Sequence, residues 1–203
     1  MKYRVPGIVD NYRKLCVYCD SIWNSVIEAY PDEIACREGC GICCELRTVN
    51  QIEAYVIRSY IDNNKNFGDD KCDDDMNVDN DGIIVDTGDT NVNNGDEFID
   101  NDNADACPFL RRQSCTIYPA RPIICRTHGL ILRSSEFPLS KQAASCPYNF
   151  PSIRPDDFPQ ELTADVDIIT KNLVNLNLAF CMANGVSAEI RVLLRDLAEK
   201  LFS

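Results

Sequence analysis

The cysteines are the residues whose type and spacing indicate chemistry. The chain has 12 Cys and one His among 203 residues. Eight of the cysteines lie in two blocks within segments punctuated by Gly and Pro. The first block holds Cys36, Cys40, Cys43 and Cys44, and the second holds Cys107, Cys115, Cys125 and Cys146. Cysteine is apolar enough to fill a core, but a dense block outside any helical pattern is better explained by metal ligation. We predict that all eight bind metal.

The residues around these cysteines suit a ligand loop. In the first block, separations of three and two residues let one turn direct several sulfurs to one point, and Gly39 and Gly41 permit the positive φ angles that such turns often need. In the second block, Pro108, Pro119 and Pro122 restrict the unfolded chain. The prolines therefore lower the entropy lost when the ligands are ordered.

Thiolate ligands narrow the choice of metal without deciding it. Soft sulfur donors select zinc, copper(I) or iron–sulfur clusters. Two zinc sites with four cysteines each would use all eight, and all-thiolate zinc sites are closed and structural. A 4Fe–4S cluster, which needs four cysteines, is equally consistent. Cys43 and Cys44 are adjacent, so they either serve two neighbouring centres or bridge them.

Three basic residues lie near Cys125. Arg121 and Arg126 flank it, and we predict that they donate hydrogen bonds to the thiolates and offset their charge. His128 is the only histidine, and we interpret it as a polar surface group rather than a ligand.

The other four cysteines have simpler interpretations. Cys16, Cys19 and Cys181 lie in helical patterns and are predicted to pack in the core. Cys72 lies among acidic residues, whose negative charge disfavours a thiolate.

Helical periodicity predicts the elements that must position the two blocks. Apolar residues recur at three- and four-residue steps over residues 7–30, and a second helix is expected over about 49–61, with Thr48 and Gln51 as its capping box. A third is expected over about 164–183, ended by Gly185.

The rest of the chain is assigned from weaker signals. Ser187 is the expected N-cap of a last helix, whose apolar stripe is Ile190, Leu193, Leu194, Leu197 and Leu201. Residues 128–133 predict a short strand, and residues 147–160, with four prolines, predict a loop. The predicted fold class is therefore mainly α: a small helical domain with irregular Cys-rich segments.

The net charge of −12 comes from one segment. Residues 61–106 hold 14 Asp and one Glu against two Lys, so the remainder of the chain is close to neutral. The segment is rich in Asn, Asp and Gly and has few apolar residues, so it should be disordered. We expect one cysteine-cluster domain over residues 1–203, interrupted by an acidic insertion at about 62–106.

The distribution of apolar and basic residues indicates the cellular location of the protein and the classes of partner that it binds. The N-terminal residues have no apolar run like that of a signal peptide, and no stretch is apolar and long enough to span a membrane. We therefore expect a cytoplasmic protein, where thiols stay reduced. No basic stripe with interleaved aromatic residues supports nucleic-acid binding. The expected partner is a metal ion, and no protein partner is indicated.

Both blocks together resemble a known family. A C-x3-C-x2-C-C block followed by C-P-F-L and C-x-I-Y-x-x-R-P-x-x-C-R is similar to the YkgJ-type CxxCxxCC cysteine-cluster family. The matching positions are Cys36, Cys40, Cys43, Cys44, Cys107, Pro108, Phe109, Leu110, Cys115, Ile117, Tyr118, Arg121, Pro122, Cys125 and Arg126. The resemblance implies a zinc- or iron-chelating domain and does not imply a reaction. One departure is the third residue between Cys36 and Cys40, where the family name has two.

An iron–sulfur protein or enzyme is the alternative. Cys36, Cys40 and Cys43 have the C-x3-C-x2-C spacing with which radical S-adenosylmethionine enzymes hold a cluster. Those enzymes need a partial barrel of alternating strands and helices, and this chain shows no such alternation. We therefore favour a metal-binding protein over an enzyme.

The insertion separates the two blocks without supplying any of the eight cysteines. Deleting residues 66–104 should therefore leave the metal content of the protein unchanged, because lengthening or shortening a loop adds only a small closure entropy. Elemental analysis of metal per chain checks this. Loss of metal in the deletion variant would show that the segment belongs to the fold.

Overall fold

A computed structural model describes residues 6–37, 40–64, 106–111, 114–136 and 143–202. Most of the predicted acidic insertion, including Cys72, lies outside these residues. The described part contains five α-helices and several two-residue strands. This confirms a mainly helical fold with irregular connections. None of the described helices is long and apolar enough to cross a membrane.

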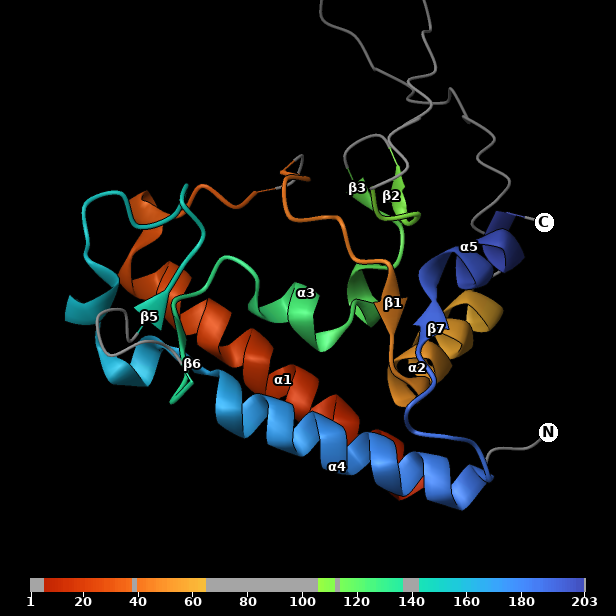
Figure 1. The fold of residues 1–203 in the computed structure, drawn as a ribbon. Helices are drawn as coiled ribbons and strands as arrows, with labels where there is room; N and C mark the ends of the chain where they lie inside the picture. Colours follow the sequence, from red (N-terminus) through yellow and green to blue (C-terminus); the bar gives the residue numbers. More distant parts are fainter. Residues whose placement is uncertain (1–5, 38–39, 65–105, 112–113, 137–142, 203) are drawn as a thin grey trace, which may run out of the picture.

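Helix α1 (Pro6–Ala29) is the central element. Its buried residues are Val9, Tyr12, Cys16, Cys19, Ile22 and Val26, which follow the predicted three- and four-residue steps. Helices α4 (Val166–Asn184) and α3 (Ile123–Thr127) pack against it from opposite sides, and α4 runs in the opposite direction to α1 (Figure 1). The expected first helix is therefore confirmed.

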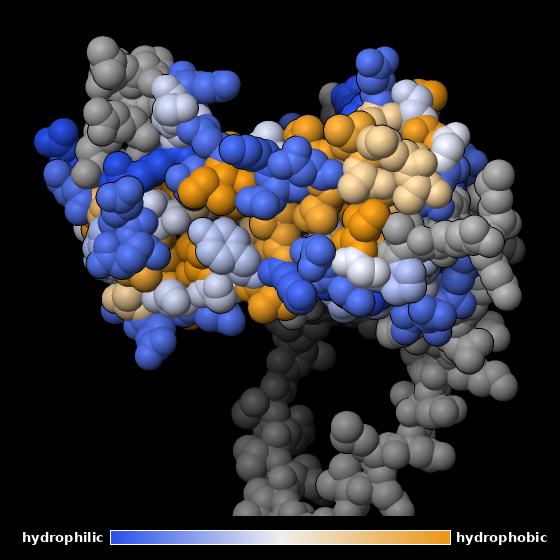
Figure 2. All heavy atoms as spheres, turned by 90° about the horizontal axis from the view of Figure 1, so that it is seen from below, coloured by the Kyte–Doolittle hydropathy of each residue, from blue (hydrophilic) through white to orange (hydrophobic). Residues whose placement is uncertain are grey.

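Helix α4 has the predicted ends. The side chain of Asp165 accepts a hydrogen bond from the backbone N–H of Ile168 at 3.0 Å, and Gly185 ends the helix at φ 64°. The helix buries Phe180 and Cys181. Its other side exposes Val174, Leu178 and Met182, and Figure 2 shows apolar side chains along the face seen from below.

The core cysteines are also as predicted. Cys16, Cys19 and Cys181 are all buried and pack in the same apolar cluster between α1 and α4. Burial raises the pKa of Cys19 to about 12, so its thiol is neutral at physiological pH. These three residues are therefore packing residues.

Helix α2 (Gln51–Asn63) packs against α4 and against α5 (Leu194–Phe202). Its capping box is formed by Asn50 and Glu53, whose side chains and backbone N–H groups bond reciprocally. The predicted pair Thr48 and Gln51 is therefore wrong by two residues, because Thr48 belongs to a strand.

The strand that contains Thr48 also makes the last helix shorter than predicted. Strand β1 (Thr48–Val49) pairs antiparallel with β7 (Val192–Leu193), and α5 begins only at Leu194. The predicted helix starting near Ser187 is therefore too long. Ile190 and Leu193 are 61% and 50% exposed rather than part of a buried stripe. Leu194 and Leu197 are buried as predicted.

Short strands and turns form the remaining connections. Strands β2 (Leu110–Arg111) and β3 (Ser114–Cys115) form a hairpin. Strand β4 (Leu132–Arg133) lies between β5 (Ala143–Ala144) and β6 (Ala164–Asp165). The 3-10 helices are η1 (Pro31–Glu33), η3 (Tyr118–Ala120), η4 (Pro155–Asp157) and η5 (Gln160–Leu162).

The strand predicted at 128–133 is confirmed only at its end. Gly129 has a φ of 91°, which an extended strand does not allow, so β4 is restricted to Leu132 and Arg133. The predicted loop at 147–160 is irregular apart from η4 and the first residue of η5.

A buried carboxylate joins α2 to α3. Oε1 of Glu53 accepts a hydrogen bond from the backbone N–H of Ile123 at 3.1 Å, and Oε2 accepts one from the N–H of Asn50 at 3.3 Å. Burial raises the pKa of Glu53, against the effect of both hydrogen bonds. This one side chain therefore satisfies the first backbone donors of two helices.

Replacing Glu53 should destabilise the fold. Glu53→Ala leaves two buried N–H groups without an acceptor and should cost about 2–4 kcal/mol. Glu53→Gln keeps one acceptor oxygen and should cost about half as much. Urea unfolding followed by circular dichroism measures both. Glu28→Ala, at an exposed position of α1, is the control, and equal losses in all three variants would contradict the assignment.

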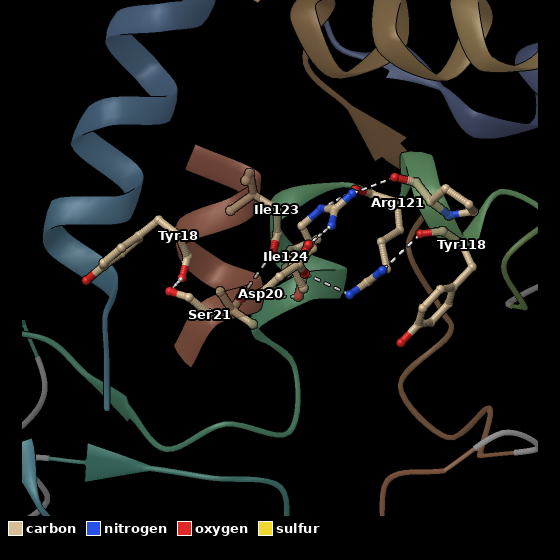
Figure 3. A network of polar contacts seen from close by, with 10 residues as sticks. Tyr18, Asp20, Ser21, Tyr118, Arg121, Ile123 and Ile124 are labelled. Atoms are coloured by element: carbon tan, nitrogen blue, oxygen red, sulfur yellow. Dashed lines mark hydrogen bonds and ion pairs between the residues drawn. The ribbon is translucent and has the colours of Figure 1, made fainter. Parts of the chain in front are cut away.

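A second polar joint holds the α3 segment on α1. Figure 3 shows Arg121 reaching Asp20, with Nη2 of Arg121 2.8 Å from Oδ1 of Asp20. Nη1 of Arg126 donates to Oδ2 of the same carboxylate. Arg126 is 6% exposed, so its charge is compensated mainly inside the protein.

Removing Asp20 should therefore weaken the attachment of α3. Asp20→Ala leaves the buried guanidinium of Arg126 without its counter-charge and should cost about 1–3 kcal/mol, reduced because Asp20 is partly exposed. Asp10→Ala breaks an exposed ion pair with Arg13 on the same helix and should cost about 0.5 kcal/mol or less. Thermal unfolding of both variants checks this, and an equally small effect of Asp20→Ala would disprove the role.

Candidate metal centre

The two cysteine blocks meet although they are far apart in sequence. The backbone N–H of Cys107 donates to the carbonyl oxygen of Cys44 at 2.7 Å. The β2–β3 hairpin then packs on the first block, since a Cβ placed on Gly41 would lie 3.0 Å from Cδ2 of Leu110. The hairpin pairs Leu110 with Cys115. Cys44, Cys107 and Cys115 are therefore held in one region.

Cys125 joins this region from α3. Burial raises the pKa of Cys125 to about 12, and the charges of Cys107, Cys115 and Cys43 act in the same direction. Burial also raises the pKa of Cys107 and of Cys115. Cys125, carried by α3, and the hairpin cysteines Cys107 and Cys115 are therefore coupled electrostatically.

Cys43 and Cys44 interact directly. The hydrogen bond between their side chains raises the pKa of Cys43 to about 12 and lowers that of Cys44. Cys43 is therefore the donor and Cys44 carries the more acidic thiol of the two. Cys43 is exposed, while Cys44 is half-buried.

His128 lies at the same place. Its side chain is hydrogen-bonded to Cys43, and this bond raises the pKa of His128 against the effect of burial. His128 is half-buried at the C-terminal end of α3. The interpretation of His128 as a simple surface group is therefore wrong. In the sequence, His128 follows Cys125 by three residues. This spacing indicates that the two residues lie in, or directly after, one short helix.

Asn149 is a site residue that sequence reasoning missed. It is 3% exposed, and its Nδ2 donates to Sγ of Cys36 at 3.3 Å and to the carbonyl oxygen of Gly129 at 2.8 Å. Its Oδ1 accepts from the N–H of Ala35 at 2.9 Å. Asn149 therefore fixes the position of Cys36. Asn149 lies in a proline-rich loop, and its nearness to Cys146 is the one feature of the sequence that points to a role at the site.

Gly129 allows this close approach. A Cβ at this position would lie 2.8 Å from Sγ of Cys36 and 2.9 Å from Cζ2 of Trp23. Its φ of 91° is also in the region that favours glycine. Any side chain at residue 129 would therefore displace Cys36.

Asn149 also contacts the backbone of Cys146. The N–H of Asn149 donates to the carbonyl oxygen of Cys146 at 3.1 Å. The next residue, Phe150, is buried and has a φ of 59°. Its backbone N–H donates to the carbonyl oxygen of Glu33 at 2.7 Å. For Cys36, burial raises the pKa, the Asn149 hydrogen bond lowers it, and the charges of Cys146, Cys40 and Cys43 raise it further.

The arginines have a different role from the one predicted. Arg121 and Arg126 direct their guanidinium groups at Asp20, and Arg126 also donates to Pro119 and Arg121 carbonyl oxygens at 2.7 and 3.0 Å. They therefore stabilise the α3 segment instead of donating to sulfur. The charge of Arg121 still lowers the pKa of Cys115, although burial raises it more.

The eleven cysteines that the structure describes form no disulfide bonds. In the same part of the chain, no three His, Cys, Asp or Glu side chains converge closely enough to enclose a metal ion. The contacts from Cys107 to Cys44 and from Leu110 to Gly41 nevertheless bring the two cysteine blocks into one region of irregular chain. That donor set fits a soft cation, because thiolates select zinc, copper(I) and iron–sulfur clusters.

Comparison with known proteins gives one match. A family model named CxxCxxCC, described as "Putative zinc- or iron-chelating domain", matches residues 35–147. The matched range covers more than half of the chain and begins and ends beside Cys36 and Cys146. No curated protein and no solved structure matches the chain. The chain therefore belongs to the CxxCxxCC family of zinc- or iron-chelating domains.

Proposed function

We propose that this protein is a chelating protein that binds zinc or iron through the thiolates of both cysteine blocks. The ligands are Cys36, Cys40, Cys43, Cys44, Cys107, Cys115, Cys125 and Cys146. The observation that carries the proposal is the 2.7 Å hydrogen bond from Cys107 to Cys44, which brings the second block onto the first.

Burial of the sulfurs supports the same function. Burial raises the pKa of Cys36, Cys107, Cys115 and Cys125, so these thiols are mostly neutral in the metal-free protein. A divalent cation among them would favour the thiolate form and displace the protons. The described cysteines of both blocks lie in turns, in a two-stranded hairpin and in a one-turn helix rather than within the long helices.

The chemistry of a closed thiolate site favours a structural or storage role over catalysis. Zinc coordinated by four thiolates has no open position for substrate. Its binding free energy also stabilises the fold, because the site does not exist in the unfolded chain. We propose a single domain in the reducing cytoplasm, where such thiolates stay unoxidised.

Metal analysis tests this function. Protein purified without oxygen should contain stoichiometric zinc or iron by elemental analysis. A colourless zinc protein would exclude the iron–sulfur alternative, whereas a brown protein with acid-labile sulfide would support a 4Fe–4S cluster and exclude zinc.

Variants provide the matched control for this measurement. Cys44→Ser should lower the metal content and the thermal stability together. Cys72→Ser, outside both blocks, should change neither. Full metal content in Cys44→Ser, or no zinc or iron in the unaltered protein, would refute the proposed function.

A further inference from the structure

Two buried asparagines each contact a cysteine, and they do so with opposite ends of the amide. Asn149 is 3% exposed, and its Nδ2 donates to Sγ of Cys36 at 3.3 Å. Asn177 is 6% exposed, and its Oδ1 accepts from Sγ of Cys181 at 3.8 Å. Building on the proposed function, we propose that Asn149 is a positioning residue for metal binding. Its N–H group stabilises the sulfur of Cys36 in the metal-bound form, so a hydrogen-bond donor at residue 149 raises the affinity for metal.

Backbone partners fix which end of the Asn149 amide faces the sulfur. The N–H of Ala35 donates to Oδ1 at 2.9 Å, and the carbonyl oxygen of Gly129 accepts from Nδ2 at 2.8 Å. An amide turned by half a rotation would place Oδ1 against a carbonyl oxygen and Nδ2 against an N–H group, and both bonds would be lost. Nδ2 therefore uses one hydrogen for Gly129 and directs the other at Cys36.

The chain beside Asn149 is also held in place. The backbone N–H of Phe150 donates to the carbonyl oxygen of Glu33 at 2.7 Å. The ring centroid of Phe150 lies 5.0 Å from that of Phe158, which in turn lies 4.8 Å from the ring centroid of Tyr30 at the end of α1. The fold therefore positions the amide donor without help from a metal, and little conformational freedom remains to be lost when Cys36 binds one.

The polarity of each contact suits a different state of the sulfur. A thiol donates a weak hydrogen bond through S–H, whereas a sulfur bound to metal has lost its proton and can only accept. Cys181 is a core residue, and its thiol has an acceptor in Asn177. Cys36 has a donor instead, and a hydrogen bond to an anionic acceptor is stronger than one to a neutral acceptor. Asn149 therefore favours the metal-bound state of Cys36, and Asn177 favours the thiol of Cys181.

Replacing the amide by a carboxylate tests the donor. Asn149→Asp keeps an acceptor for Ala35 but presents an oxygen to Cys36, and should lower the zinc affinity by about a hundredfold. Asn149→Ala removes the donor without adding an opposing charge, and should lower the zinc affinity by about tenfold. The affinity of the full-length protein is measured without oxygen by chelator competition for zinc, and circular dichroism reports whether each variant stays helical.

Asn177→Asp is the matched control. Asn177 accepts a hydrogen bond from the N–H of Ile52 at 3.2 Å and donates one to the carbonyl oxygen of Ala188 at 3.5 Å. Aspartate at residue 149 or 177 therefore keeps one accepted backbone bond and loses one donated backbone bond. The two variants differ in the sulfur contact, since Cys181 is not a ligand. Asn177→Asp should leave the zinc affinity unchanged.

The order of the two Asn149 variants separates this role from simple support of the loop. Alanine loses all three side-chain hydrogen bonds of Asn149, whereas aspartate keeps the one from Ala35. If the amide only supported the backbone, Asn149→Ala would bind zinc more weakly than Asn149→Asp. A greater loss in Asn149→Asp, with none in Asn177→Asp, supports the proposed role.

Several results would overturn the role of Asn149. These are a loss in Asn149→Ala equal to or greater than that in Asn149→Asp, an equal loss in Asn177→Asp, and unchanged affinity in both Asn149 variants. If Asn149→Asp does not fold, Asn149→Ala decides, and full zinc affinity in that variant would reject the role. An unaltered protein that binds neither zinc nor iron would instead reject the proposed function, so the two failures are distinguishable.

Discussion

The packing of α1 between α4 and α3 is the interaction on which the rest of the structure depends. The apolar stripe of α1 faces α4, a long helix with well-defined caps. Helix α1 also supports α3, which has only five residues and carries Cys125. A helix of that length is not stable alone, because forming its first turn costs more conformational entropy than one hydrogen bond returns. The position of Cys125 is therefore set by α1.

Three buried or half-buried polar side chains complete that frame. Glu53 satisfies the first N–H groups of α2 and α3, Asp20 compensates the charge of Arg126, and Asn149 joins Ala35, Cys36 and Gly129. Glu53 and Asn149 act on backbone N–H groups at helix starts and in irregular chain. Backbone donors in such segments have no helix or sheet partner, so side chains must satisfy them. The positions of Cys36 and Cys125 in this chain thus depend on polar contacts as well as on apolar packing.

The parts of the fold that could be predicted are those decided by local pattern. The three- and four-residue periodicity of α1 and the Gly185 cap of α4 depend on neighbouring residues alone, and both are confirmed. The last helix was predicted too long because Leu193 and its neighbour pair with β1, a strand far away in sequence. Because Thr48 belongs to β1, α2 begins two residues later than predicted and its capping box is formed by Asn50 and Glu53. Long-range pairing therefore overrode local propensity in both of these errors.

The sequence by itself determined the membership of the family and the two cysteine blocks, because residue type and close spacing are local properties. Only the tertiary structure decided which cysteines are neighbours, that His128 contacts Cys43, and that Asn149 holds Cys36. It also turned the arginines toward Asp20. These contacts join segments separated by long stretches of chain. Their geometry follows from how helices pack and how buried polar groups are satisfied, and spacing along the chain does not contain that information.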